Sequence, residues 1–167
     1  MILTIWRHGK AEEGVDDRLR ELTVSGRDDV SFGSHQFHDA CRVRNLPHPH
    51  RILHSPLVRT TQTARIIAAA YAHATVSSEP ALRPGSEVTG VGAAVSRFPD
   101  SDAREQHTLL VSHQPLVSRL VEHWLGDAGN IPFIPPGGLV TLSLDVVAPG
   151  CGVLLFWAFP PEYEAGV

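Results

Sequence analysis

The chain has 167 residues, of which 43% are hydrophobic and 19% charged, and its formal net charge is -4. This length predicts one folded domain, residues 1–167, with one sizeable core. A mildly acidic chain without a run of Lys or Arg argues against nucleic-acid binding, which needs a basic face. The longest apolar run, residues 151–159, is too short to cross a bilayer, which takes roughly 20 residues. The apolar stretch at residues 1–6 is also too short for a signal peptide, so we expect a cytoplasmic protein that does not bind membranes.

Short apolar strands alternate with amphipathic helical stretches along the chain. The expected strands cover residues 2–6, 51–54, 75–78, 108–111, 140–144 and 153–159. The expected helices begin near Thr23 or Ser25, at Pro56, near Val88 and at Leu116. The first of these is weakened by Gly33, and the last two strands are expected to form a hairpin around residues 149–150. The alternation predicts a three-layer α/β/α sandwich with a mostly parallel central sheet.

Polar residues follow three of the predicted strands. The first strand ends in Arg7 and His8, the second is followed closely by Arg59, and the fourth ends in Ser112 and His113. In parallel sheets ligands bind beyond the carboxyl ends of the strands, so these side chains are expected to meet if their strands are neighbours. Two guanidinium groups at one place need an anion between them, and their planar forks match phosphate oxygens. The sequence therefore predicts a phosphoryl-binding site.

His8 is the candidate nucleophile of that site. One ring nitrogen would attack phosphorus while a backbone carbonyl holds the other and sets the tautomer. A protonated His113 would stabilise the phosphoryl oxygens together with Arg7 and Arg59. The product of the first step would be a phosphohistidine on His8, which water then hydrolyses to inorganic phosphate.

Four segments also resemble motifs of the histidine phosphatase superfamily, in the same order along the chain. They are the RHG sequence at 7–9, LTxxG at 22–26, SPxxRxxQTA at 55–64 and the VSHQP sequence at 111–115. The short length, and residues 82–85, most resemble the SixA type of phosphohistidine phosphatase. The resemblance implies that Arg7, Arg59 and His113 bind phosphate around the nucleophile His8.

Two departures from the family pattern bear on the chemistry. Ser112 replaces the usual glycine before the second histidine, where it would either donate to phosphate or cap a turn. Pro84 stands near the position at which much of the superfamily has an acidic proton donor, and Glu87 is the possible substitute. A missing acid matters less for phosphohistidine than for phosphomonoesters, because imidazole leaves as a neutral molecule once its ring is protonated.

These observations predict a metal-independent phosphatase that removes phosphate from phosphohistidine on a protein, such as a histidine-phosphotransfer domain. A phosphatase of small phosphomonoesters or sugar phosphates and a non-catalytic phosphohistidine-binding module are the alternatives. No metal or other cofactor is expected, because no group of His, Cys and carboxylates has metal-site spacing. The two cysteines, Cys41 and Cys151, are predicted to be buried free thiols.

The remaining histidines suggest no second site. His54 adjoins the predicted phosphate site, where it would either line the pocket or serve a structural role. The other seven histidines share no helical face or ligand spacing, and we expect them on the surface. These seven are His35, His38, His48, His50, His73, His107 and His123.

Overall fold

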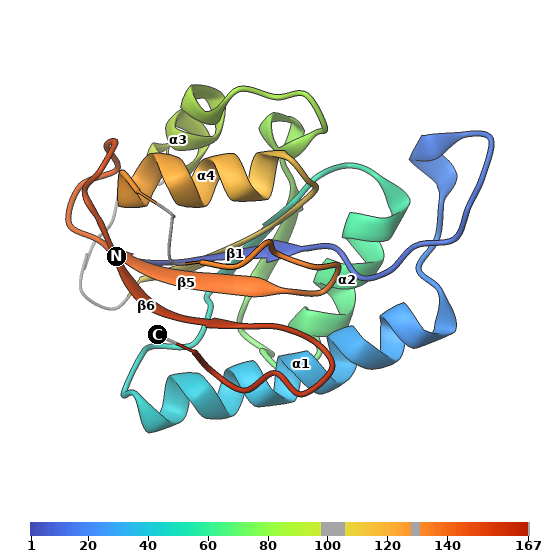
Figure 1. The fold of residues 1–167 in the computed structure, drawn as a ribbon, viewed down its shortest axis with the longest axis horizontal. Helices are drawn as coiled ribbons and strands as arrows, with labels where there is room; N and C mark the ends of the chain where they lie inside the picture. The colour runs from blue at the N-terminus through green and yellow to red at the C-terminus, as the bar shows by residue number, and fades with distance from the viewer. Residues whose placement is uncertain (98–105, 128–130, 167) are drawn as a thin grey trace.

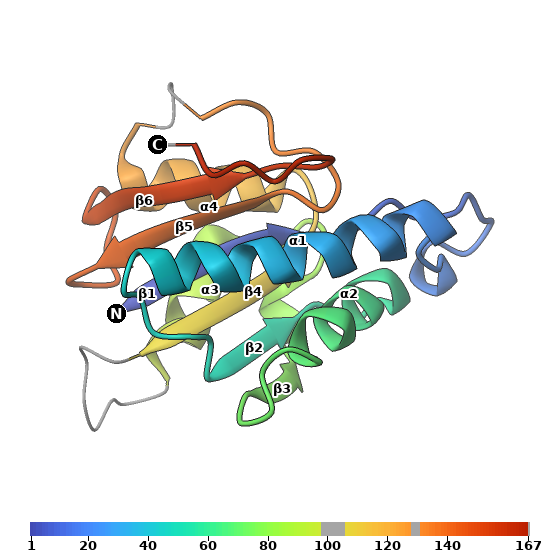
Figure 2. The ribbon, with the colours of Figure 1, turned by 90° about the horizontal axis from the view of Figure 1, so that it is seen from below.

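A six-stranded sheet forms the centre of the molecule in a computed structural model that describes residues 1–97, 106–127 and 131–166. Its strand order is β3-β2-β4-β1-β5-β6 (Figures 1 and 2). The strands are β1 (Ile2–Arg7), β2 (Arg51–His54), β3 (Thr75–Ser78), β4 (His107–Ser112), β5 (Leu139–Leu144) and β6 (Gly152–Ala158). The helices are α1 (Val24–Val43), α2 (Val58–Ala68), α3 (Val88–Ser96) and α4 (Leu116–Leu125), with 3-10 turns η1 (Asp17–Leu19) and η2 (Pro80–Leu82).

The sheet is mixed but mostly parallel, as the sequence predicts. β1 pairs in parallel with β4, β4 with β2, and β2 with β3. β5 runs antiparallel to both β1 and β6, so within the described chain it alone opposes the other strands. The hairpin expected around residues 149–150 is confirmed as the connection between β5 and β6.

Helices cover both faces of the sheet and complete the predicted three layers. Figure 1 shows α3 and α4 over one face, and α1 with α2 over the other. Alternate residues of β1 serve the two layers: Leu3 and Ile5 pack in the cluster with α3 and α4, and Trp6 packs in the cluster with α1 and α2. None of the described helices combines the length and the hydrophobicity that a bilayer span requires.

Gly33 lies inside helix α1, at a position where a neighbouring side chain leaves no room for a Cβ atom. A Cβ atom on Gly33 would collide with the ring of Tyr163. The Tyr163 hydroxyl reaches past the helix and donates to the carbonyl of Gly137 at 3.0 Å. At the start of the helix, Thr23 is the N-cap and its hydroxyl accepts from the Gly26 amide at 2.9 Å. The packing of Tyr163 thus outweighs the low helix propensity of glycine.

Two local expectations are wrong. Helix α2 begins at Val58 rather than at Pro56, because Leu57 is extended and serves as its N-cap. The carbonyl of Ser55 accepts from the Thr60 hydroxyl at 2.7 Å, which holds residues 55–57 as a loop ahead of the helix. Cys41 is a buried free thiol as predicted, but Cys151 is exposed because it lies in the turn before β6.

Candidate active site

The carboxyl ends of β1 and β4 bring two histidine rings close together. These strands are direct neighbours, with Arg7 opposite Ser112, so His8 and His113 leave the sheet side by side. The His8 amide donates to the Ser112 carbonyl at 3.0 Å, and the two imidazole centroids lie 5.0 Å apart. The site therefore forms where the sequence places the ends of the central strands.

His8 is held as a neutral imidazole whose unprotonated nitrogen faces Arg59. Its Nδ1 lies 2.7 Å from the Gly9 carbonyl, which only accepts, so Nδ1 carries the proton. The Nε2 atom accepts from Nε of Arg59 at 3.3 Å. Burial lowers the pKa of His8 to about 4, and the charges of Arg59 and Arg7 contribute in the same direction. The ring is thus neutral at pH 7, with Nε2 as its nucleophilic atom.

His113 is buried without hydrogen-bond partners. Only 2% of the residue is exposed, and neither ring nitrogen has a partner within the described residues. Burial, followed by the proximity of His8 and Arg59, lowers its pKa to about 3. The protonated His113 expected from the sequence is therefore not the state favoured in this structure. The neutral ring still offers one N–H donor, and an anion bound beside it would raise its pKa.

Arg7 and Arg59 both lie close enough to the two histidines for their charges to lower the pKa of each ring. Nη1 of Arg7 donates to the Ile134 carbonyl at 3.0 Å, and its Nε is buried with no partner in the part of the chain that the structure describes. Burial lowers the pKa of Arg7. Arg59, which is 4% exposed, uses Nη1 and Nη2 to bind the Asp17 carbonyl at 2.6 Å and the Asp17 carboxylate at 3.0 Å. These two hydrogen bonds to Asp17 leave Nε of Arg59 free to donate to Nε2 of His8.

Asp17 is the main site residue that sequence reasoning missed. It lies on η1 and also accepts from Nη1 of Arg20 at 3.0 Å. Burial raises the pKa of Asp17, but the hydrogen bonds from Arg59 and Arg20 lower it more, and the pKa is below its ordinary value. The group is ionised at neutral pH and positions arginines rather than donating a proton. In the sequence it is one of several acidic residues on a polar loop, with no spacing that marks it.

The motif residues around His8 hold its loop in place. The Gly9 amide donates to the Thr63 hydroxyl at 3.2 Å, and the Leu22 amide donates to Oε1 of Gln62 at 2.8 Å. A Cβ atom on Gly9 would lie 2.8 Å from the Gly26 carbonyl, so this close approach requires glycine. The QTA part of the SPxxRxxQTA motif thus fixes the backbone at Gly9 and at Leu22, on both sides of the loop that follows the nucleophile.

The two weaker candidates, Ser112 and Glu87, are engaged elsewhere. The Ser112 hydroxyl is fully buried and donates to the Leu82 carbonyl at 2.8 Å, so its single proton is not available to phosphate. The Glu87 carboxylate pairs with Arg119 at 2.9 Å, and the Glu87 side chain is 73% exposed. Neither contact directs these side chains toward His8. The structure thus gathers Arg7, His8, Arg59 and His113, and it does not gather Ser112 or Glu87.

Other histidines have structural roles or surface positions. Nδ1 of His54 lies 2.8 Å from the Ser55 carbonyl, which favours the structural role. The prediction that His107 is a surface residue is wrong: it is fully buried at the start of β4. Its Nδ1 lies 2.7 Å from the Pro47 carbonyl, and its Nε2 lies 2.7 Å from the Thr4 hydroxyl. Among the described residues, no cluster of three or more His, Cys, Asp or Glu could hold a metal ion.

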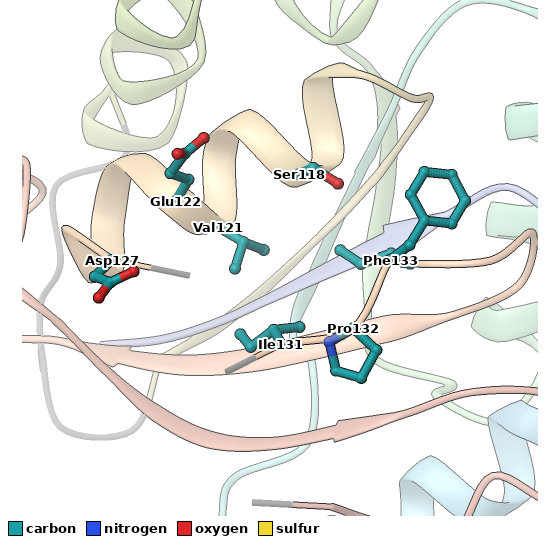
Figure 3. A pocket seen from close by; sticks show the side chains of 8 residues that line it. Ser118, Val121, Glu122, Asp127, Ile131, Pro132 and Phe133 are labelled. Atoms are coloured by element: carbon teal, nitrogen blue, oxygen red, sulfur yellow. The ribbon is translucent and has the colours of Figure 1, made fainter. Parts of the chain in front are cut away.

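A separate cavity of about 330 Å³ lies behind the Arg7 contact, between α4 and residues 131–134. Figure 3 shows Val121 of α4 opposite Ile131 and Pro132 across this space. The cavity lining contains none of the four converging residues. Its link to the site is the Ile134 carbonyl, which accepts from Arg7.

Comparison with known proteins identifies a family for part of the chain and similar folds. Residues 3–85 match the model of the histidine phosphatase superfamily (branch 1). No curated protein sequence matches the chain. Among solved structures, the protein histidine phosphatase SixA complexed with tungstate has a TM-score of 0.76 and 24% identity, covering 96% of this chain and 97% of that one.

Two further structures extend this likeness. A protein assigned as phosphohistidine phosphatase SixA from Agrobacterium tumefaciens has a TM-score of 0.75 and 19% identity, covering 96% of this chain and 98% of that one. Phosphoglycerate mutase from Plasmodium falciparum has a TM-score of 0.67 and 19% identity, covering 99% and 97%. At these identities the likenesses establish the fold, and the family model covers the segment that carries His8 and Arg59. Residues 3–85 of this chain, close to half of its length, are identified as histidine phosphatase superfamily (branch 1) sequence.

Proposed function

We propose that this protein is a metal-independent phosphatase that removes phosphate from phosphohistidine on a protein, through a phosphoryl intermediate on His8. One observation carries the proposal. Among the described residues, Nε of Arg7 and both ring nitrogens of His113 are buried and have no hydrogen-bond partner, and Nε2 of the neutral His8 beside them accepts from Arg59. Buried polar groups are normally paired, so this group of donors is suited to an oxyanion bound next to the nucleophile. The cytoplasmic location expected from the sequence is part of the proposal.

In the first step Nε2 of His8 attacks phosphorus, and the bond from phosphorus to the leaving group breaks. The Nε–H of Arg59, now donated to His8, would turn to a phosphoryl oxygen as the lone pair is used. Arg7 and the N–H of His113 would supply further donors to the oxygens, which is the main protein contribution to phosphoryl transfer. The Gly9 carbonyl accepts from Nδ1 and so stabilises the positive charge that develops on the ring. Water then attacks the phosphohistidine and releases inorganic phosphate.

The surroundings of the site favour phosphohistidine as substrate. Phosphomonoesters expel an alkoxide, which needs a proton donor, whereas imidazole accepts a proton with a pKa of roughly 6.5 and leaves neutral. Asp17 is ionised by its two arginines, and Glu87 is paired with Arg119. No carboxylic acid is therefore poised beside His8 in the described structure. A histidine-phosphotransfer domain is the kind of partner that presents such a residue.

The test is turnover of a phosphorylated histidine-phosphotransfer domain by the wild type and by His8→Ala. We expect release of phosphate and an acid-labile phosphoenzyme in the wild type, and loss of both in the variant. His73→Ala, at an exposed histidine, is the matched control and should retain full activity. Tungstate should inhibit by occupying the oxyanion site. Full activity of His8→Ala would refute the mechanism, and equal rates on phosphomonoesters with a loss in Glu87→Gln would favour the phosphomonoesterase alternative.

A further inference from the structure

A groove of about 520 Å³ opens beside the phosphate site. Residues from three segments line it: Asp17 and Arg18 from η1, Pro56 and Leu57 before α2, and Arg83 and Pro84 after η2. Figure 2 shows the loop that carries η1 lying next to the start of α2. Asp17 binds Arg59, which contacts His8, so the groove and the phosphate site share this wall.

Arg83 is the uncompensated charge of the groove. Within the described residues its guanidinium makes no hydrogen bond or ion pair, and the residue is exposed. Arg18, by contrast, is engaged by the Asp16 carboxylate through Nε at 3.0 Å and Nη2 at 2.8 Å. The acidic residues that flank Arg83 in sequence are also occupied, because Glu79 pairs with Arg97 and Glu87 with Arg119.

The backbone that carries Arg83 is anchored to the site. Leu82 is fully buried, and its carbonyl accepts from the hydroxyl of Ser112, the residue before His113. Arg83 therefore extends from a fixed turn, next to the strand end that supplies His113. Pro56, Leu57 and Pro84 contribute apolar surface to the same groove. The groove is thus suited to a chain segment that has both apolar atoms and a negative charge.

We propose that this groove binds the segment next to the phosphorylated residue of the substrate protein, and that Arg83 binds an Asp or Glu carboxylate there. Guanidinium matches a carboxylate with two parallel hydrogen bonds. A guanidinium donates hydrogen bonds but does not give up its proton to a leaving group, so it cannot serve as a general acid. The role of Arg83 is therefore recognition of the substrate. This inference rests on the proposed function, since it requires a phosphorylated protein as the substrate.

The experiment measures binding, which does not depend on turnover. Two peptides carry a stable phosphonate analogue of phosphohistidine, one with flanking Glu residues and one with Gln in their place. For the wild type at low salt we expect the acidic peptide to bind about fivefold more tightly, the scale of an exposed ion pair. Arg83→Ala should remove this preference, and Arg83→Glu should reverse it. Arg42→Glu makes the same change in charge at an exposed arginine of α1 and should retain the preference.

Three results would overturn the inference: equal affinity of the wild type for the two peptides, an unchanged preference in Arg83→Glu, or binding of neither peptide. Turnover of the corresponding phosphohistidine peptides tests the proposed function separately. Turnover with a KM that depends on neither the flanking charge nor Arg83 would reject the groove and keep the phosphatase. An Arg83-dependent preference in binding without any turnover would keep the groove and reject the phosphatase.

Discussion

The two ends of β4 carry two buried histidines that differ in one respect. His107 begins the strand and His113 follows its last residue. Burial lowers the pKa of both, to about 4 for His107 and about 3 for His113. Both ring nitrogens of His107 have partners, in Pro47 and Thr4, whereas those of His113 have none within the described chain.

This difference separates a structural histidine from a candidate ligand-binding one. Burial and a lowered pKa are common to both residues, so neither property identifies the site. A buried imidazole whose nitrogens are satisfied contributes to folding, whereas an unsatisfied one is destabilising unless a ligand pairs with it. The same substitution at the two positions should therefore have opposite consequences for activity and stability.

The largest expected effect is on catalysis in His113→Leu. The variant loses an N–H donor to the phosphoryl oxygens, and kcat should fall by about 100-fold or more, the scale measured for a lost oxyanion donor. The free energy of unfolding should stay the same or rise, because an unpaired polar group is removed from the interior. Steady-state kinetics and urea unfolding measure the two quantities. A stable variant with wild-type kcat would show that His113 is not a phosphate ligand.

The next effect is a loss of stability in acid. The folded-state pKa of His107 lies near 4, below the ordinary value of 6.5, so the unfolded chain takes up a proton first as the pH falls. Stability is thus complete above pH 6.5 and declines toward pH 4, by on the order of 3 kcal/mol for His107 alone. Urea unfolding at pH 7.5 and pH 5 measures the decline. His107→Leu should show a shallower decline than the wild type, and an equal slope would contradict the assignment.

At neutral pH, His107→Leu should destabilise the fold by about 1–3 kcal/mol, because the Pro47 carbonyl and Thr4 hydroxyl lose a partner. Thr4 retains its contact with the Thr141 hydroxyl at 2.9 Å, which limits the loss. Chemical unfolding checks the stability, and kcat below the unfolding transition should remain close to that of the wild type. A large fall in kcat with unchanged stability would instead connect His107 to the chemistry.

The smallest expected effect is that of Ser112→Ala, at the end of the same strand. Removing the hydroxyl breaks its hydrogen bond to the Leu82 carbonyl and should lower stability by about 1 kcal/mol. Affinity for tungstate, measured by calorimetry, should not change, because the hydroxyl proton is already engaged. A tenfold weaker affinity would restore Ser112 as a phosphate ligand.

The sequence predicts the layers, the mostly parallel sheet and the meeting of its strand ends. Apolar periodicity marks the strands and helices, and the ends of parallel strands share one edge of a sheet, so Arg7, His8 and His113 could be placed together. Arg59 could be added because it follows a third strand of that edge within a few residues.

The remaining features depend on contacts between distant segments. The Asp17–Arg59 ion pair joins a polar loop to α2 across 42 residues, and no local pattern specifies it. His107 looks like a polar residue at a strand start until the fold brings the Pro47 carbonyl, 60 residues away, to its ring. From the sequence, Gly33 is expected to weaken the helix, and only the structure shows that Tyr163 packs against this position.

The contact of Tyr163 has a consequence for engineering this protein. Its hydroxyl donates to the carbonyl of Gly137, and the amide of Gly137 lies 3.1 Å from the carbonyl of Arg7 and 2.9 Å from that of His8. A tyrosine near the far end of the chain is thus two hydrogen bonds from the backbone of the nucleophile. Trimming the chain before Tyr163, or joining a fusion partner in its place, would loosen the histidine that the chemistry depends on.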